Sequence, residues 1–181
     1  IVDSEVSTMI SDLKTLINIP SVSAKNQNLV ECAEAVFAIM NRVGIKSEII
    51  YLDPKDKNIA ASSLPPPPPV VYGEIKSQKN PNGKTILFYN HYDVQPEDPL
   101  DQWNVPPFSG EVSGNYIYGR GSSDDKGELI TRIKAVEYFL RETGDVPCNI
   151  KFIVEGEEEI GSVHLEKYLI KYKEKFTCDG I

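Results

Sequence analysis

The sequence is poor in the features that mark disulfide-stabilised and membrane-spanning proteins. Its 181 residues include only three cysteines, Cys32, Cys148 and Cys178, which lie far apart and form no Cys-x-x-Cys pair. Such a set gives no disulfide framework and favours a reducing compartment, which we expect to be the cytoplasm. No apolar run approaches the roughly 18–20 residues of a membrane span. Residues 1–5 also lack the basic and apolar regions that begin a signal peptide.

The sequence also has fewer basic than acidic residues. The chain has 19 Lys and Arg against 27 Asp and Glu, which gives a net charge of −8. This balance repels a phosphate backbone, so we expect no nucleic-acid partner, and we expect no membrane partner either. The hydrophobic fraction of 40% and the charged fraction of 25% are ordinary for a globular domain. The acidic excess is either solvated surface or a source of cation ligands.

The periodicity of apolar residues predicts an α/β domain. Helices are expected at 6–17, 29–43, 125–141 and 163–175. Strands are expected at 46–52, 70–76, 85–90 and 149–154, with a hairpin at 110–112 and 116–118. A buried strand, a helix and a second buried strand in succession favour a right-handed crossover. The fold class is therefore a three-layer α/β sandwich with a central, largely parallel or mixed sheet.

Several local details follow from the same patterns. In the second helix we expect an inward face made of Val30, Ala33, Phe37 and Met40. Asn82-Gly83 predicts a tight turn between two strands. Ser162 is expected to cap the last helix, with His164 as a structural residue on its surface.

The five prolines at 65–69 form the one low-complexity segment of the chain. Proline cannot donate to a sheet, so a polyproline II conformation is expected. A rigid connector before the next strand is the favoured interpretation, and a ligand for an SH3-type domain is the alternative.

Polar residues gather in three clusters near predicted strand ends. Asn90-His91-Tyr92-Asp93 follows one strand, and Glu155-Gly156-Glu157-Glu158-Glu159 follows another. A glycine-rich stretch at 119–127, which contains Asp124, precedes a helix and lacks the spacing of a phosphate loop or a calcium loop. Ligands of open α/β sheets bind at the carboxyl ends of the strands. We therefore expect the three clusters to meet at one edge of the sheet.

These residue types suit a metal centre. Positions i and i+2 of an extended chain point the same way, so Asp93 is expected beside His91. By itself this pair favours a hydrogen-bonded structural histidine, and the alternative is a metal-bound imidazole oriented by a carboxylate. The glutamate run is either a solvated acidic turn or a set of cation ligands. Asp124 is either a helix cap or a ligand, and the two roles are compatible for Asp124 and Asp125. One imidazole with several carboxylates favours Zn²⁺, with Co²⁺ or Mn²⁺ as alternatives, and the surplus of carboxylates favours two ions.

Three motifs together identify a family. HYDVQP (91–96), the stretch 103–127 and EGEEEIGS (155–162) resemble the dizinc metallopeptidase family of carboxypeptidase G, aminoacylase, succinyl-diaminopimelate desuccinylase and carnosinase-type dipeptidases. IPSVS (19–23) resembles the turn after that family's first helix. The resemblance spans nearly the whole chain, and the wording of the motifs is most similar to the dipeptidase branch.

The resemblance implies a metal set. His91 resembles a ligand of one zinc ion, Glu159 a ligand of the other, and Asp124 the carboxylate that bridges them. The family often has a cis peptide after this aspartate, here between Asp124 and Asp125. Two zinc ions per complete site are implied, with a peptide or N-acyl amino acid as substrate.

The resemblance also implies two catalytic residues. Asp93 resembles the residue that orients the histidine ligand, and Glu158 resembles the general base and proton shuttle. Glu155 and Glu157 match no role in the family and are expected to be structural.

By the same resemblance, residues 1–181 correspond to the N-terminal portion of the catalytic domain. The family has two more ligands, an acid expected just beyond Ile181 and a histidine near its C-terminus. It also has a lid domain that often dimerises. The expected activity is a zinc-dependent hydrolase of peptide or N-acyl amide bonds, with this chain alone inactive. A non-catalytic binding or assembly module on the same fold is the alternative, and an unselective acidic surface is a third reading.

Overall fold

The computed structural model describes residues 2–53 and 66–181, and the side chains of residues 2–5 are not included. The helices are α1 (Val2–Ile17), α2 (Leu29–Arg42), α4 (Lys126–Thr143), α5 (Leu165–Lys171) and α6 (Lys173–Phe176). The strands are β1 (Lys46–Ile50), β2 (Val70–Ile75), β3 (Thr85–His91), β4 (Glu111–Ser113), β5 (Tyr116–Tyr118) and β6 (Asn149–Glu155). Short 3-10 turns occupy Ser23–Lys25, Leu100–Gln102 and Glu158–Ile160.

The central sheet is mixed, as the sequence predicts. Its order is β1-β2-β6-β3, and β4 and β5 form a separate hairpin. β3 runs parallel to β6 after the α4 crossover, whereas β1, β2 and β6 pair antiparallel. The parallel pairing puts the ends of β3 and β6 at the same edge, with His91 opposite Glu155.

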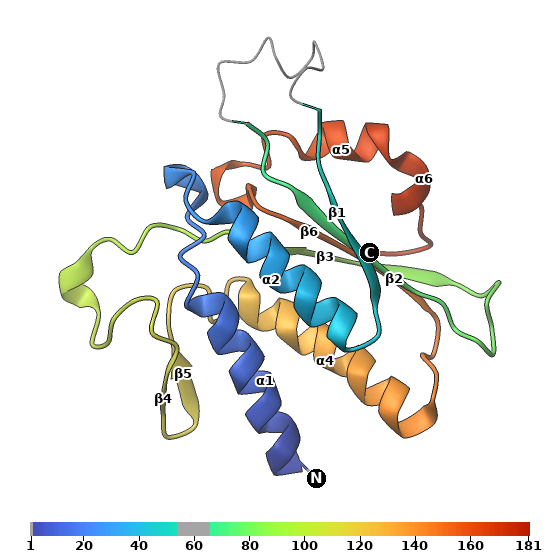
Figure 1. The fold of residues 1–181 in the computed structure, drawn as a ribbon, viewed down its shortest axis with the longest axis horizontal. Coiled ribbons are helices and arrows are strands. Elements are labelled where there is room, and N and C mark those ends of the chain that lie inside the picture. Colours follow the sequence, from blue (N-terminus) through green and yellow to red (C-terminus); the bar gives the residue numbers. More distant parts are fainter. Residues whose placement is uncertain (1, 54–65) are drawn as a thin grey trace.

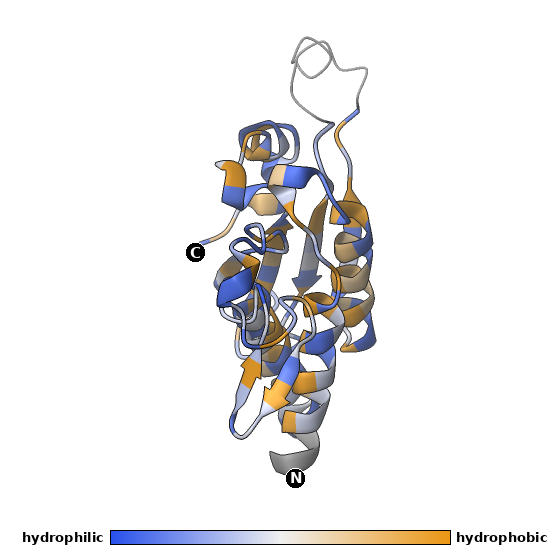
Figure 2. Ribbon diagram, turned by 90° about the vertical axis from the view of Figure 1, so that its left-hand side faces the viewer, coloured by the Kyte–Doolittle hydropathy of each residue, from blue (hydrophilic) through white to orange (hydrophobic). Residues whose placement is uncertain are grey.

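Helices cover both faces of this sheet, which gives three layers (Figure 1). One face packs against α1, α2 and α4, with Leu16, Met40 and Phe152 among its fully buried residues. The other face packs against α5 and α6 through Tyr168 and Phe176. The strands lie between the two helical layers in Figure 2. Two apolar cores, one on each face, hold the sheet rigid beneath the polar residues at its edge.

The β2–β3 connection differs from the expected turn between neighbouring strands. The backbone N–H of Gly83 donates to the carbonyl of Asn80 at 3.0 Å, so a tight turn does form there. However, β6 lies between β2 and β3 in the sheet. A local turn signal cannot reveal a strand that arrives later in the chain and inserts between its two neighbours.

The expected inward face of α2 is wrong at Val30, which is 46% exposed, and correct at Ala33 and Met40. Leu29, Cys32 and Val36 complete the buried face instead. The helix is therefore rotated slightly from the orientation that Val30 would require.

The end of the chain also departs from expectation. The last helix is split at Tyr172 into α5 and α6. Ser162 does not cap it: the residue has φ +52° and its hydroxyl donates to Glu155. His164 is 1% exposed rather than on the surface. Both side chains turn inward because buried carboxylates accept their hydrogen bonds.

The proline run supports the connector interpretation where the structure describes it. Pro65 lies outside the described residues, and residues 66–69 lead into β2 without helix or strand structure. The carbonyl of Pro68 accepts from the Tyr168 hydroxyl at 2.8 Å, and that of Pro69 accepts from the Tyr92 hydroxyl at 2.6 Å. These bonds fix the segment against the domain.

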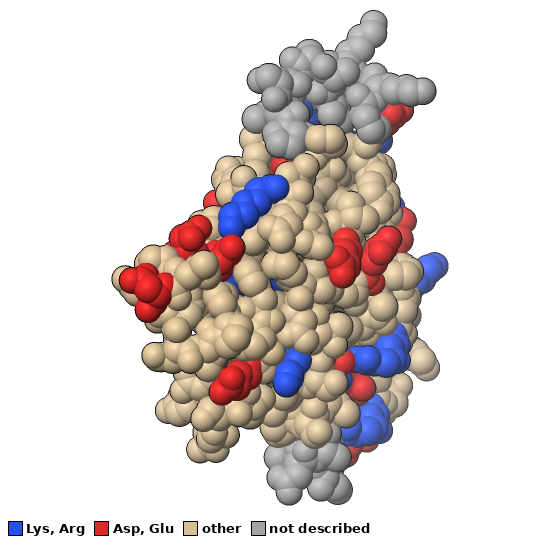
Figure 3. Space-filling view, turned by 60° about the vertical axis from the view of Figure 1, so that its left-hand side comes forward, with Lys and Arg blue, Asp and Glu red and all other residues tan. Residues whose placement is uncertain are grey.

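The surface carries both signs of charge. Acidic and basic side chains are interspersed on the face shown in Figure 3 rather than gathered into one patch. Among the described residues, no helix is long and apolar enough to span a bilayer.

Candidate metal centre

The site is built where β3 and β6 end side by side. The backbone N–H of Tyr92 donates to the carbonyl of Glu155 at 2.8 Å, which continues the pairing one residue past β3. The loop that follows β3 therefore leaves the sheet beside the loop that follows β6. The glycine-rich stretch closes the third side, because Asp124 and Asp125 lie directly before α4.

His91 lies at the centre of this edge and is 5% exposed. Its Nδ1 is 3.1 Å from the carbonyl oxygen of Asp93 and 3.3 Å from Oδ1 of the same residue. Both neighbours are acceptors, so Nδ1 carries a proton and Nε2 is the nitrogen directed to the site. Nε2 lies 3.0 Å from Oδ1 of Asp124 and 3.7 Å from Oε2 of Glu158.

Asp93 contacts both the imidazole of His91 and the turn that follows β6. Its side chain is fully buried. Beyond the imidazole, Oδ1 accepts from the backbone N–H of Glu158 at 3.2 Å and Oδ2 accepts from that of Glu159 at 3.1 Å. The predicted orienting residue thus also holds the turn that carries the predicted base and the predicted ligand.

Asp124 and Asp125 are joined by a cis peptide bond, as the sequence resemblance implies. The side chain of Asp124 is 75% exposed and points to Nε2 of His91. Asp125 takes the position before α4 but its side chain makes no capping bond. Instead its Oδ2 accepts from Nδ2 of Asn90 at 2.7 Å and from the backbone N–H of His91 at 3.0 Å. The two aspartates therefore have different contacts: Asp125 binds the end of β3, and Asp124 faces the candidate site.

The structure brings the three predicted ligands together. One ligand atom each of His91, Asp124 and Glu159 lies within 4.8 Å of the others. Gln95 forms a hydrogen bond with Glu159: its Nε2 donates to Oε2 of the carboxylate at 2.7 Å. A nitrogen and two carboxylate oxygens at this separation fit a small divalent cation of the Zn²⁺, Co²⁺ or Mn²⁺ type.

The electrostatics favour added positive charge. Burial by itself lowers the pKa of His91, but the hydrogen bonds and charge of Asp93, together with Asp125, outweigh it and raise the pKa to about 9. Burial raises the pKa of Glu159, and the neighbouring Asp124 carboxylate raises it further. The raised pKa of His91 reflects the negative charge around it, and the raised pKa of Glu159 reflects burial first and the neighbouring Asp124 carboxylate second. A cation would relieve this repulsion.

The candidate site opens to solvent through a depression of about 370 Å³. Its lining includes His91, Asp124 and Glu158, together with Glu128 and Arg132. Two of the predicted ligands, His91 and Asp124, and the predicted base can therefore be reached by a substrate as well as by an ion.

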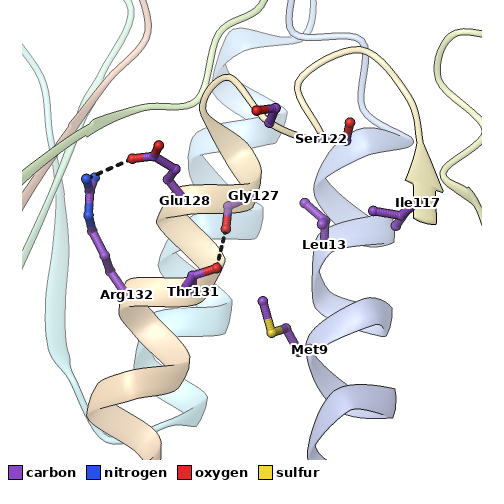
Figure 4. Close-up of a pocket in the computed structure, with 9 residues that line it drawn as sticks. Met9, Leu13, Ile117, Ser122, Gly127, Glu128, Thr131 and Arg132 are labelled. Atoms are coloured by element: carbon purple, nitrogen blue, oxygen red, sulfur yellow. Dashed lines mark hydrogen bonds and ion pairs between the residues drawn. The ribbon is translucent and has the colours of Figure 1, made fainter. Parts of the chain in front are cut away.

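A second, more apolar hollow of about 470 Å³ lies between α1 and α4. Figure 4 shows Met9, Leu13 and Ile117 around it, with the ion pair of Glu128 and Arg132 on the opposite side of α4. The two hollows share Glu128 and Arg132, so the candidate site continues over α4 toward α1.

Sequence reasoning missed several supporting residues. Gln95 donates to Glu159 and Tyr89 donates to Glu155 at the end of β6, and the sequence gives neither a role. Asp125, which the sequence interprets as a helix cap or a ligand, instead accepts from the backbone N–H of His91. Glu155 and Glu157 are both buried, and each is hydrogen-bonded to a neighbouring side chain. Gln95 lies inside the HYDVQP motif, so its position could have drawn notice. The partners of Glu155 and Glu157 depend on folding of the 156–164 loop, which no local pattern specifies.

Known proteins resemble this chain along almost its whole length. Residues 87–181 match the peptidase family M20/M25/M40. The human Beta-Ala-His dipeptidase is 35% identical over 97% of the chain. The crystal structure of human carnosine dipeptidase 1 superposes with a TM-score of 0.81 at 33% identity over 97% of the chain. An M20 family metallo-carboxypeptidase from Sulfolobus solfataricus gives a TM-score of 0.77 at 36% identity over 98% of the chain.

The chain covers little more than a third of these relatives. It spans 35% of the human dipeptidase sequence, 37% of the human dipeptidase structure and 36% of the archaeal carboxypeptidase. The similarity therefore concerns one part of each relative, the part that contains the counterparts of β3, α4 and β6.

Proposed function

Because this chain belongs to peptidase family M20/M25/M40, we propose that it forms part of the catalytic unit of a metal-dependent hydrolase of peptide or N-acyl amide bonds. The observation that carries the proposal is the convergence of His91, Asp124 and Glu159 within 4.8 Å, at the ends of β3 and β6 and the start of α4. Residues from three segments far apart in sequence meet with the donor types of a zinc site.

The ligand roles are those that the family resemblance implies. His91 and Asp124 would hold one ion, and Asp124 and Glu159 would hold a second, with Asp124 as the bridge. Zinc is the proposed ion, because one imidazole among carboxylates suits a borderline-hard cation. When bound, such ions polarise a carbonyl group and lower the pKa of a water molecule toward ~7.

Glu158 is the proposed general base. Its side chain is 42% exposed, and its Oε2 lies 3.7 Å from Nε2 of His91, so it faces both solvent and the predicted ligands. It would accept the proton of the attacking water and return it to the leaving amine. Asp93 would act by position, since it fixes the imidazole of His91 and the backbone of Glu158.

We also propose that residues 1–181 are the N-terminal portion of the catalytic domain, and that further ligands come from other parts of the protein. Gly180 forms a parallel bridge with Ile86, and the N–H of Leu87 donates to the carbonyl of Gly180 at 2.9 Å. A chain that continued this pairing along β3 would run toward His91. The edge of β3 is thus suited to receive a further strand.

Substrate and assembly are proposed at the level of class. The relatives named above are a dipeptidase and a carboxypeptidase; both names support a peptide as substrate, and the dipeptidase name supports a short one. A homodimer and a cytoplasmic location are the corresponding proposals for the whole protein.

The test is a Glu158→Gln variant of the complete protein that carries this chain. Turnover of a panel of dipeptides and N-acyl amino acids should fall by at least about 10³-fold, with metal content unchanged. Glu31→Gln, on the exposed side of α2, is the control and should leave turnover as it was. Full turnover in the Glu158 variant would remove this residue from the role of base. Retained metal without any turnover in the unaltered protein would favour the binding-module alternative.

A further inference from the structure

We propose that the buried pair of Glu157 and His164 is a positioning device that fixes the turn carrying Glu158 and Glu159. The inference rests on the proposed function, because the turn matters only if these two glutamates serve the metal centre. Neither Glu157 nor His164 touches the candidate site itself. Their proposed effect passes through the backbone between them.

The pair is closed off from solvent. The side chains of His164 and Glu157 are 1% and 7% exposed. Nδ1 of His164 lies 2.9 Å from Oε1 and 3.0 Å from Oε2 of Glu157, and the backbone N–H of His164 donates to Oε2 at 3.1 Å. One carboxylate therefore binds both the ring and the backbone of a residue seven positions later.

This contact closes a short loop around the two functional glutamates. Within it, the N–H of Ser162 donates to the carbonyl of Glu157 at 2.7 Å, and the N–H of Gly161 donates to that of Glu158 at 2.9 Å. A loop this short, with both ends held by one carboxylate, has few alternative backbone conformations.

A second buried carboxylate holds the same loop from β6. Oε1 of Glu155 accepts from the Ser162 hydroxyl at 2.6 Å and from the Tyr89 hydroxyl at 2.5 Å. Asp93 accepts the backbone N–H groups of Glu158 and Glu159. The turn is thus held at its base by Glu155 and Asp93 and across its ends by Glu157.

Stability alone is a poor reason for such a pair. Burying an imidazole and a carboxylate carries a desolvation penalty that apolar residues of the same size avoid. Nε2 of His164 is also buried without a hydrogen-bond partner in the described structure, which adds to the cost. The pair provides directional hydrogen bonds between the two ends of the loop, which an apolar contact would not provide.

The experiment compares two substitutions at one position in the complete protein. His164→Leu removes the side-chain donor to Glu157 and keeps the backbone donor, whereas His164→Asn keeps a side-chain N–H donor near the place of Nδ1. Affinity for Zn²⁺, measured by competition with a chelator, should fall roughly 10–100-fold in the Leu variant and recover most of that loss in the Asn variant. The visible spectrum of the Co²⁺-loaded protein should shift in the Leu variant alone.

Asp145→Asn is the matched control for lost stability. Asp145 is a buried carboxylate with several hydrogen bonds, but it precedes the opposite end of β6. It should lower thermal stability without altering Zn²⁺ affinity or the Co²⁺ spectrum. Equal loss of Zn²⁺ affinity in this control and in His164→Leu would overturn the proposal, since the effect would then be one of general stability.

Amide hydrogen exchange separates this inference from the proposed function, because it needs no metal. The N–H groups of Glu158 and Glu159 should exchange at least about 10-fold faster in His164→Leu, while that of Phe152 in β6 is unchanged. Unchanged exchange at both glutamates would overturn the positioning role even if Zn²⁺ binds. If the unaltered protein bound no Zn²⁺ and exchange still accelerated, the pair would position the turn and the proposed function would fail.

Glu157→Gln, which keeps the shape of the carboxylate, gives the same readout if His164→Leu does not fold.

Discussion

Oδ1 of Asp93 lies 3.3 Å from Nδ1 of His91, and both side chains are almost completely buried. This contact fixes which nitrogen of the ring is free for an ion. The same carboxylate binds two backbone N–H groups of the turn after β6. Asp93 therefore couples a ligand that ends β3 to the base and ligand that follow β6.

The first prediction concerns this coupling. Asp93→Asn cannot accept all of these hydrogen bonds, because its amide nitrogen only donates. Affinity for Zn²⁺ should fall roughly 10–100-fold, and turnover of the complete protein should fall with it. Isothermal titration with Zn²⁺ measures the first and a dipeptide assay the second. An Asp93→Asn protein with unaltered affinity would show that the contact has no bearing on the ion.

The second prediction concerns Gln95 and Glu159. The amide of Gln95 donates to one oxygen of Glu159 and leaves the other for an ion. Gln95→Glu places a like charge there, so the Glu159 carboxylate should turn away and Zn²⁺ affinity should drop at least about fivefold. Gln95→Met, which removes the donor without adding charge, should have a smaller effect. The reverse order of the two variants in a chelator competition would contradict this reading of the contact.

The third prediction concerns the helical layer. Asp12 of α1 is buried and bonds Arg42 of α2 at 2.6 Å and Lys134 of α4 at 2.7 Å, so one carboxylate joins three helices. Asp12→Ala leaves Lys134 with Glu137 as its remaining partner. The free energy of unfolding in urea should fall by about 1–3 kcal/mol. Glu137→Ala removes a more exposed partner and should cost less than about 1 kcal/mol. Comparable losses in the two variants would argue against a special role for Asp12.

The fourth prediction concerns pH. Backbone N–H groups of Gln78 and Lys79, with the Ser77 hydroxyl and the N–H of Val146, lower the pKa of Asp145 to about 2. The unfolded chain has a pKa near ~3.9 at this position. The ionised carboxylate therefore stabilises the fold fully above about pH 4 and loses this effect as the pH falls through about 2. Asp145→Asn should be less stable than the unaltered protein at pH 7, and the difference should shrink below pH 4. A difference that is the same at pH 7 and pH 3 would contradict the assignment.

Most helices and the main side chains of the candidate site can be predicted from the sequence, because the patterns that indicate them are local. Apolar spacing predicts α1, α2 and α4 within a few residues, and the motif wording predicts which side chains meet. His91 ends β3 and Asp93 lies two residues later, so the i, i+2 pattern of an extended chain predicts their contact although Asp93 is beyond the strand.

Other features depend on contacts between distant segments. β6 inserts between β2 and β3 because its two faces complete both cores, which no turn signal records. Ser162 has the sequence of a helix cap but donates to Glu155, and His164 is drawn inward by Glu157. In both cases a hydrogen bond to a buried carboxylate replaces the conformation that the local sequence favours.

The most direct test of the account is the metal content of the complete protein that carries this chain. The protein is dialysed against trace zinc and analysed for elements, alongside His91→Ala and Glu159→Ala variants. The account predicts two zinc ions per chain in the unaltered protein and the loss of at least one in each variant. No zinc above the buffer level in the unaltered protein, or two ions retained in both variants, would contradict it.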